Sequence, residues 1–106
     1  MTQLPAVAVD ARANVYFGGL CVSHTVHAAD GSRKSVGVIL PTGGKPLTFN
    51  TGAPERMDLV EGQCRVRLPG TTDWQTFRGG ESFSVGGNTS FDIDVSEALH
   101  YVCHFG

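Results

Sequence analysis

The sequence reads SVGVIL at residues 35–40, ERMDLVEG at residues 55–62 and GESFSVGGN at residues 80–88. Each stretch combines residues that favour β-strands with glycines that favour turns. The chain as a whole shows few helical periods among its apolar residues. Together these features predict an all-β domain in which short strands are joined by glycine turns.

The same pattern continues on both sides of these stretches. It predicts strands at residues 14–17, 20–27, 34–40, 47–51, 74–77, 82–85, 91–95 and 101–105, and a hairpin over residues 57–68 that turns at Glu61-Gly62-Gln63. About ten short strands with regular turn signals predict one sandwich or barrel domain over residues 14–106. Residues 1–13 have no clear period, and we expect a loosely held N-terminal tail or an extra edge segment there.

The composition excludes several classes of function. The chain has 106 residues and a formal net charge of −2, without runs of like charge, so we expect no binding to nucleic acid or a membrane surface through bulk electrostatics. No apolar stretch approaches the roughly 18 residues of a membrane span, and the N-terminus does not resemble a signal peptide. Cys21, Cys64 and Cys103 are odd in number and lack CxxC spacing, so we expect buried, reduced thiols in a cytoplasmic protein.

The histidine spacing does not predict a metal site. His24 and His27 lie three residues apart and point to opposite faces of a strand. His100 and His104 share a face, but four strand residues separate them by about 13 Å, too far for one ion. We therefore expect no metal and no cofactor. The same alternation turns Cys103 away from both of these histidines, which disfavours a catalytic thiol.

An anion site is better supported by the residues. Residues 30–35 read DGSRKS, which places two cations and two hydroxyls at a predicted turn. Phosphate is bound by arginine, hydroxyl donors and free backbone N–H groups, although a solvated hairpin tip has a similar composition. Trp74 is interpreted as a plug of the barrel rather than a stacking platform. Glu55 is either a rim carboxylate or a ligand of a ribose hydroxyl.

These residues carry a family resemblance that runs from about Asn14 to Phe105. The chain resembles the pyrimidine/purine nucleoside phosphorylases, small single-domain bacterial proteins of the cupin fold that were formerly a domain of unknown function. The matching pieces are Tyr16-Phe17 with Gly18, Arg33, Ser35-Val36-Gly37-Val38, Phe49, Pro54-Glu55, Met57, Gly62, Leu68-Pro69, Thr72-Asp73-Trp74-Gln75, Gly80, Phe83, Val85, Phe91, Val95, Tyr101 and Cys103. The chain departs from the family at Gly86-Gly87-Asn88, where a Pro-Gly-His stretch is expected, and at His104, where an arginine-like residue is expected.

The resemblance implies a cupin-like, jelly-roll barrel that converts purine and pyrimidine nucleosides and phosphate into free base and ribose 1-phosphate without a metal. It makes Arg33 and Glu55 candidates for catalysis, and Arg33 with Ser35 candidates for phosphate binding. Phe91, Tyr101 and Gln75 become candidates for nucleoside binding. A homodimer is expected, because small barrels often cover an open edge by pairing. Two alternatives remain, a non-catalytic barrel that binds a small ligand and, less favoured, a metal-dependent cupin enzyme.

Overall fold

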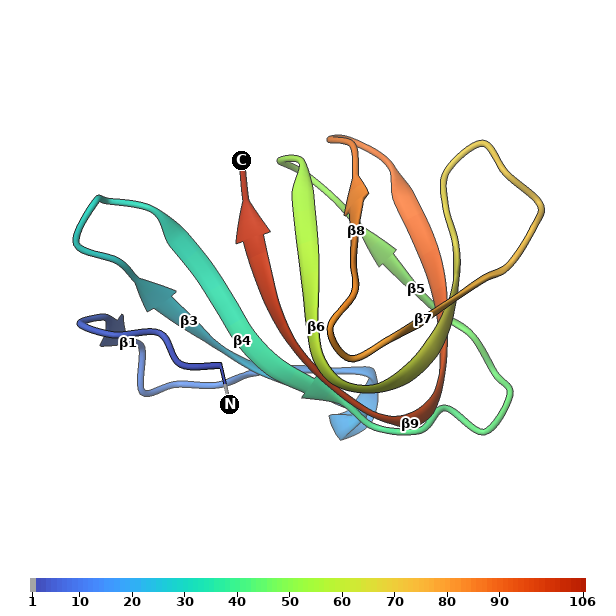
Figure 1. Ribbon diagram of the computed structural model, residues 1–106, viewed down its shortest axis with the longest axis horizontal. Helices are drawn as coiled ribbons and strands as arrows, with labels where there is room; N and C mark the ends of the chain where they lie inside the picture. The colour runs from blue at the N-terminus through green and yellow to red at the C-terminus, as the bar shows by residue number, and fades with distance from the viewer. Residues whose placement is uncertain (1) are drawn as a thin grey trace.

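The computed structural model describes residues 2–106 as one strongly curled β-sheet (Figure 1). The elements are β1 (Ala8–Val9), β2 (Asn14–Tyr16), the 3-10 turn η1 (Phe17–Gly19), β3 (Cys21–His27), β4 (Arg33–Ile39), β5 (Leu47–Asn50), β6 (Glu55–Arg67), β7 (Gln75–Arg78), β8 (Ser82–Val85) and β9 (Ser90–Phe105). The main path of the sheet is β1-β3-β4-β9-β6-β7, while β2 pairs with β3, β5 with β9 and β8 with β6. Every pairing is antiparallel, and the predicted all-β, cupin-like class is confirmed.

The two long strands β6 and β9 form the frame of the molecule. They pair along their whole length, from Glu55 opposite Phe105 to Arg67 opposite Asp92. Both bend sharply near the middle (Figure 1). The second half of β9 therefore pairs with β4, and its first half pairs with β5. This bend makes a single sheet curl around an interior.

Two predictions about these strands were wrong. Residues 57–68 do not form a hairpin, because β6 continues without interruption through Glu61-Gly62-Gln63. The register with β9 shifts at three places between Leu59 and Cys64, which identifies this glycine region as a bulged bend and not a turn. The strands predicted at 91–95 and 101–105 are likewise one strand. Among residues 2–106 the sheet therefore has nine strands, fewer than the ten expected.

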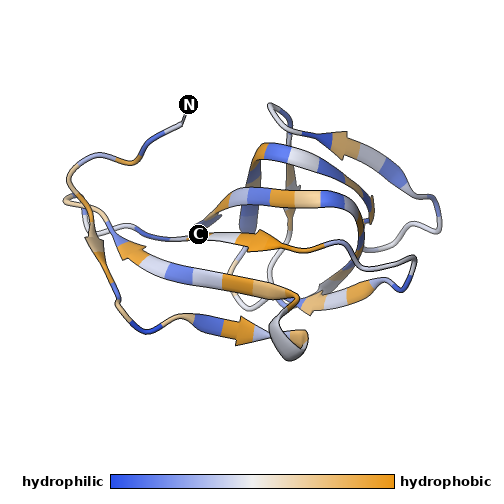
Figure 2. Cartoon of the chain, turned by 90° about the horizontal axis from the view of Figure 1, so that it is seen from below, coloured by the Kyte–Doolittle hydropathy of each residue, from blue (hydrophilic) through white to orange (hydrophobic). Residues whose placement is uncertain are grey.

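The core lies inside the curl and follows the alternation of the strands. Hydrophobic and hydrophilic residues alternate along the ribbon (Figure 2). The fully buried side chains include Ile39, Cys64, Val66, Ile93 and Leu99. All three cysteines are buried and free, as predicted. Because every second side chain of a strand points to the same face, the polar cavity residues and the core residues lie on one side of the sheet.

The N-terminal segment extends the edge of the sheet. Ala8 and Val9 pair with His27 and Val26 as strand β1. Asp10 then accepts contacts from two histidines, with its backbone oxygen 3.0 Å from His24 Nδ1 and its Oδ1 3.1 Å from His27 Nε2. Within residues 2–106 the chain forms no helix with the length and apolar character of a membrane span.

Candidate active site

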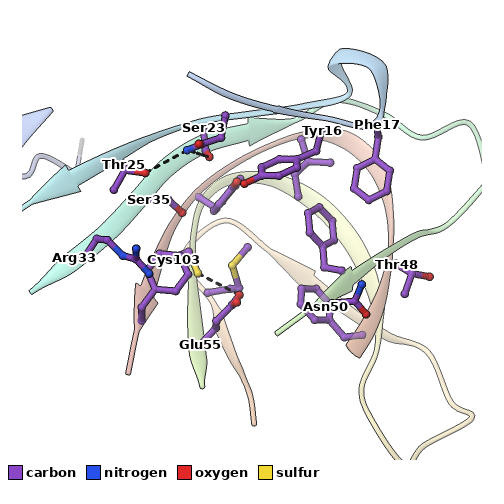
Figure 3. A pocket seen from close by; sticks show the side chains of 17 residues that line it. Tyr16, Phe17, Ser23, Thr25, Arg33, Ser35, Thr48, Asn50, Glu55 and Cys103 are labelled. Carbon is purple, nitrogen blue, oxygen red and sulfur yellow. Dashed lines mark hydrogen bonds between the residues drawn. The ribbon is translucent and has the colours of Figure 1, made fainter. Parts of the chain in front are cut away.

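A cavity of about 540 Å³ opens inside the curled sheet (Figure 3). Elements β2, η1, β3, β4, β5, β6 and β9 all contribute to its wall. The charged side chains and the Phe17–Phe49 ring pair occupy different parts of the wall. In Figure 3, Arg33, Ser35, Thr25, Glu55 and Cys103 lie at one end, whereas Phe17, Thr48 and Asn50 lie at the other. We call the end with Arg33 and Glu55 the polar end, although the Phe105 ring also lies there. The end with Phe17 is called the aromatic end, and it also holds Thr48 and Asn50.

Strand β4 supplies the positive charge of the polar end. Alternation along β4 turns Arg33, Ser35 and Ile39 toward the cavity. The Arg33 guanidinium carbon lies 4.9 Å above the centre of the Phe105 ring. Among residues 2–106, no carboxylate lies within ion-pair distance of Arg33. The guanidinium is therefore held by an aromatic contact, and its five N–H donors remain available to an anion.

Hydroxyl groups of the neighbouring strands lie beside this arginine in the cavity wall. Ser35 is buried and lies opposite Thr25 on β3 and opposite Cys103 on β9. Asn14 donates from Nδ2 to Thr25 Oγ1 at 3.2 Å and to Ser23 Oγ at 3.5 Å. These neutral donors and acceptors lie on adjacent strands and face one interior. They can bind an anion together with Arg33 without adding negative charge.

Gly37 on β4 lies between Tyr101 on β9 and the backbone of β3. A Cβ at Gly37 would come within 2.5 Å of the Val22 carbonyl oxygen and 2.7 Å of Ser23 Cβ, so only glycine fits there. Tyr101 on β9 is the cross-strand partner of Gly37, and its hydroxyl lies 3.5 Å from Cys21 Sγ on β3. The tyrosine side chain therefore crosses β4 over the glycine. Burial raises the pKa of Tyr101 far above its usual range, so the phenol stays protonated.

Glu55 and Cys103 form a second pair at the polar end. The Cys103 thiol donates to Glu55 Oε1 over 3.4 Å. Burial raises the pKa of the Glu55 carboxyl despite this hydrogen bond. Burial, followed by the negative charge of Glu55, also raises the pKa of the Cys103 thiol far above its usual range. A thiol that remains protonated is a poor nucleophile, which argues against covalent catalysis by Cys103.

The aromatic end is built from rings of three elements. The Phe49 ring on β5 stacks on Phe91 of β9, with centroids 5.6 Å apart and 15° between planes. The ring centroid of Phe17 on η1 lies 5.1 Å from that of Phe49, and the two ring planes make an angle of 72°. Tyr16, at the end of β2, also lines the cavity. This row of rings continues the hydrophobic core to the surface.

Five of the six residues predicted for the site line this cavity: Arg33, Ser35, Glu55, Phe91 and Tyr101. Gln75 does not. It is exposed on β7 opposite Val66, where β7 pairs with the second half of β6. Sequence reasoning assigned no role to Phe17 or Phe49, although both belong to the pieces that carry the family resemblance. The sequence signal for Phe17 was the aromatic pair Tyr16-Phe17 directly before the turn residues Gly18-Gly19.

Trp74 does not plug the barrel, contrary to the prediction. Its ring lies on the outside, 5.0 Å from the Arg65 guanidinium carbon and 4.9 Å from that of Arg67. Both arginines also form ion pairs with aspartates on β9. The Nη2 atom of Arg65 lies 2.7 Å from Asp94 Oδ2, and that of Arg67 lies 2.6 Å from Asp92 Oδ2. The turn at residues 71–74 carries the ring back over β6, so cation–π contacts and not core packing hold it there.

Among residues 2–106, no histidine lines the cavity. Within residues 2–106, no group of three or more His, Cys, Asp or Glu side chains has the arrangement of a metal site. His104 Nε2 lies 2.7 Å from Asp58 Oδ2, and His100 Nε2 lies 3.8 Å from Glu61 Oε2. Asn88, with φ of 53°, closes the turn before β9. Neither His104 nor Asn88, the two departures from the family pattern, lies among the residues that line the cavity.

Comparison with known proteins gives concordant matches in sequence and structure. A family model described as pyrimidine/purine nucleoside phosphorylase matches residues 11–105. A protein of that name from Azoarcus sp. is 62% identical over 98% of this chain and 95% of its own length. Another of that name, from Methylococcus capsulatus, is 58% identical over the whole of both chains.

The solved structures agree with the fold. A crystal structure of a protein of unknown function (DUF1255) from Acinetobacter sp. ADP1 is 52% identical, covers 98% of both chains and superimposes with a TM-score of 0.95. The crystal structure of Fe(II) HppE is only 10% identical and covers 100% of this chain and 60% of its own, with a TM-score of 0.74. At that identity the likeness concerns the fold alone.

Proposed function

Because the chain belongs to the pyrimidine/purine nucleoside phosphorylase family, we propose that it is a pentosyltransferase that cleaves purine and pyrimidine nucleosides with inorganic phosphate. The products are the free base and ribose 1-phosphate. The observation that carries this proposal is the division of one cavity into an arginine–hydroxyl end and an aromatic end. A phosphate and a nucleobase need these two chemistries, and the ribose joins them.

The chemistry follows from the charge that develops during cleavage. A phosphate oxygen forms a bond to C1′ of the ribose while the C1′–N bond breaks and its electron pair moves to the base nitrogen. The nitrogen then takes the proton that the hydrogen phosphate gives up. The sugar passes through a state with oxocarbenium character, as in glycoside hydrolysis. A phosphate held against C1′ is both nucleophile and counter-charge, so positioning supplies much of the rate enhancement.

Arg33 and Ser35 hold the phosphate in this proposal. The guanidinium offers paired N–H donors in the geometry that a phosphate accepts, and the buried Ser35 hydroxyl donates from the neighbouring inward position of β4. Since the guanidinium has no carboxylate partner within the described chain, the phosphate does not compete with an internal ion pair. Binding therefore costs little rearrangement.

Glu55 accepts hydrogen bonds from the ribose hydroxyls. It starts β6 at the polar end of the cavity and already accepts one hydrogen bond from Cys103. A carboxylate stabilises the positive charge that develops on the sugar, and it orients C1′ toward the phosphate. Broad tolerance of bases follows from the hydrocarbon rings at the other end, because ring stacking distinguishes bases less sharply than edge hydrogen bonds do.

We also propose that the reaction needs no metal or other cofactor. Arg33 supplies the positive charge that a metal ion would otherwise bring to the phosphate. The enzyme would act in the cytoplasm, where three buried free cysteines stay reduced. It would act as a homodimer, because an apolar groove runs between the N-terminal segment and the outer face of β3, β4, β6 and β9. Its lining includes Val9, Val22, Val36, Val60 and Val102.

The test is release of free base from adenosine, guanosine, inosine, uridine, cytidine and thymidine, with and without phosphate, by protein treated with a chelator. We expect base release only in the presence of phosphate, together with one ribose 1-phosphate per base, or its deoxy form from thymidine. Release without phosphate would identify a hydrolase. Loss of activity on chelation would identify a metal enzyme, and no release by folded protein would identify a binding module.

A further inference from the structure

Phe17 has an unusual position for a large apolar side chain. The residue is 42% exposed, and its φ of 53° lies in the left-handed region that favours glycine. Gly18 and Gly19, which follow it, also have positive φ angles. Strained residues of this kind persist where the surrounding structure holds them, and they are concentrated at functional sites. The backbone thus holds an exposed aromatic ring at the cavity.

The rings expected to bind the base from sequence do not offer a free face. Phe91 is only 4% exposed, and Phe49 stacks on it nearly parallel. Tyr101 is 6% exposed, and its hydroxyl is engaged with Cys21. A stacking platform needs a ring face that a ligand reaches. Phe91 and Tyr101 therefore form the wall behind the site.

Phe17 and Phe49 together make an open corner. Both rings line the cavity, and their planes meet at 72°. A flat heterocycle in this corner stacks on one ring and presents its edge to the other, which are the two arrangements that aromatic pairs prefer. Figure 3 shows Phe17 at the end of the cavity opposite to Arg33. A nucleoside whose base occupies the corner therefore extends its ribose toward Glu55 and Arg33.

We propose that Phe17 is the base-positioning residue, and that it stacks with Phe49 against the nucleobase. This inference rests on the proposed phosphorolysis and identifies the part of the site that binds the base. The competing explanation is that Phe17 only covers Phe49 and closes the end of the core. In the reverse reaction, the two explanations predict different effects on the KM of the free base and on the KM of ribose 1-phosphate.

The experiment measures nucleoside synthesis from free base and ribose 1-phosphate, with the KM of each substrate determined separately. Phe17→Gly removes the ring and also removes the backbone strain, since glycine readily adopts a positive φ. Phe17→Tyr keeps a ring. Val15→Ala is the matched control, because Val15 is 62% exposed in the same segment and does not line the cavity.

Phe17→Gly should raise the KM for adenine and for uracil about 5- to 100-fold, the range that loss of one base–aromatic stack produces. The KM for ribose 1-phosphate should stay near the wild-type value, and Phe17→Tyr and Val15→Ala should resemble wild type. Unchanged KM values for the bases, or an equal rise for both substrates, would overturn the proposal.

A second measurement separates this inference from the proposed function. Saturation-transfer NMR detects binding of adenine and uracil without turnover. If wild-type protein shows no phosphorolysis, the proposed function fails, and Phe17 is judged by this signal alone. A signal that Phe17→Gly abolishes and Phe17→Tyr preserves supports the base-positioning role, whereas a signal that is absent from wild type or unaffected by Phe17→Gly overturns it.

Discussion

At the proposed site, Glu55 is a carboxyl whose burial lowers the stability of the folded protein at neutral pH. Burial raises the pKa of its carboxyl in the folded protein, so the folded state binds a proton more tightly than the unfolded chain does. The free energy of unfolding therefore falls as the pH rises from the unfolded pKa to the raised folded pKa, and stays low above it. A carboxylate retained at such a cost is typical of an active site.

We predict that Glu55→Gln removes this pH dependence and makes the protein more stable at pH 7. The kcat of base release should fall at least about tenfold, because the variant lacks the negative charge beside the ribose. Urea denaturation at pH 4 and pH 7, with rates measured on the same protein, checks both parts. A variant that is less stable at pH 7 than wild type, or equally active, would show that the carboxylate has no such role.

Local patterns identified many of the site residues but not the way they combine. Residues 30–35 were predicted as an anion site from their cations and hydroxyls, and the family resemblance singled out Arg33 with Ser35. Both line the cavity. Gln75 was assigned to the site by family resemblance alone, and the pairing of β7 with the far half of β6 takes it elsewhere. The importance of Phe17 depends on a backbone angle and on a contact with Phe49, 32 residues away in the sequence, neither of which follows from residue type.

At the scale of the elements, the bend of β6 decides the shape of the cavity. Gly62 lies in this bend with φ of 108°, and a Cβ there would overlap the carbonyl oxygen of Ala98 on β9. A glycine followed by a polar residue is compatible with either a turn or a bulge, because both structures place glycine in the left-handed backbone conformation. Long-range pairing with β9 selects the bulge, which is why the sequence alone predicted a hairpin.

We predict that Gly62→Ala destabilises the protein by roughly 2 kcal/mol or more, since strain in φ is combined with a clash against backbone. Gly70→Ala is the matched control, because Gly70 has φ of 77° but open space around it, and strain alone costs about 1–2 kcal/mol. Equilibrium unfolding in urea compares them. Equal losses for the two variants would mean that contact with β9 does not constrain the bend.

At the scale of the whole molecule, the outer apolar groove predicts the oligomeric state. Val36 and Val60 line it, each is 37% exposed, and His24 and His100 lie beside them. A charge placed in such a face is desolvated when a second copy covers it. We predict that Val36→Asp weakens self-association at least about tenfold, as measured by sedimentation velocity over a concentration series.

Leu40→Asp provides the control for this surface. Leu40 is 42% exposed at the end of β4 and does not line the groove, so its replacement should leave the mass unchanged. A wild-type protein that sediments as a monomer at every concentration would contradict the dimer. So would equal dissociation of the two variants.

The most direct test of the account is the phosphate dependence of base release by wild type, Arg33→Gln and Arg78→Gln. Arg78 is an exposed arginine on β7, outside the cavity, and controls for the loss of one positive charge. We predict saturable phosphate dependence in wild type and in Arg78→Gln, and a KM for phosphate raised about 10- to 100-fold in Arg33→Gln, as expected when hydrogen bonds to a charged group are lost. Base release that is independent of phosphate, or an Arg33→Gln variant with the wild-type KM for phosphate, would contradict it.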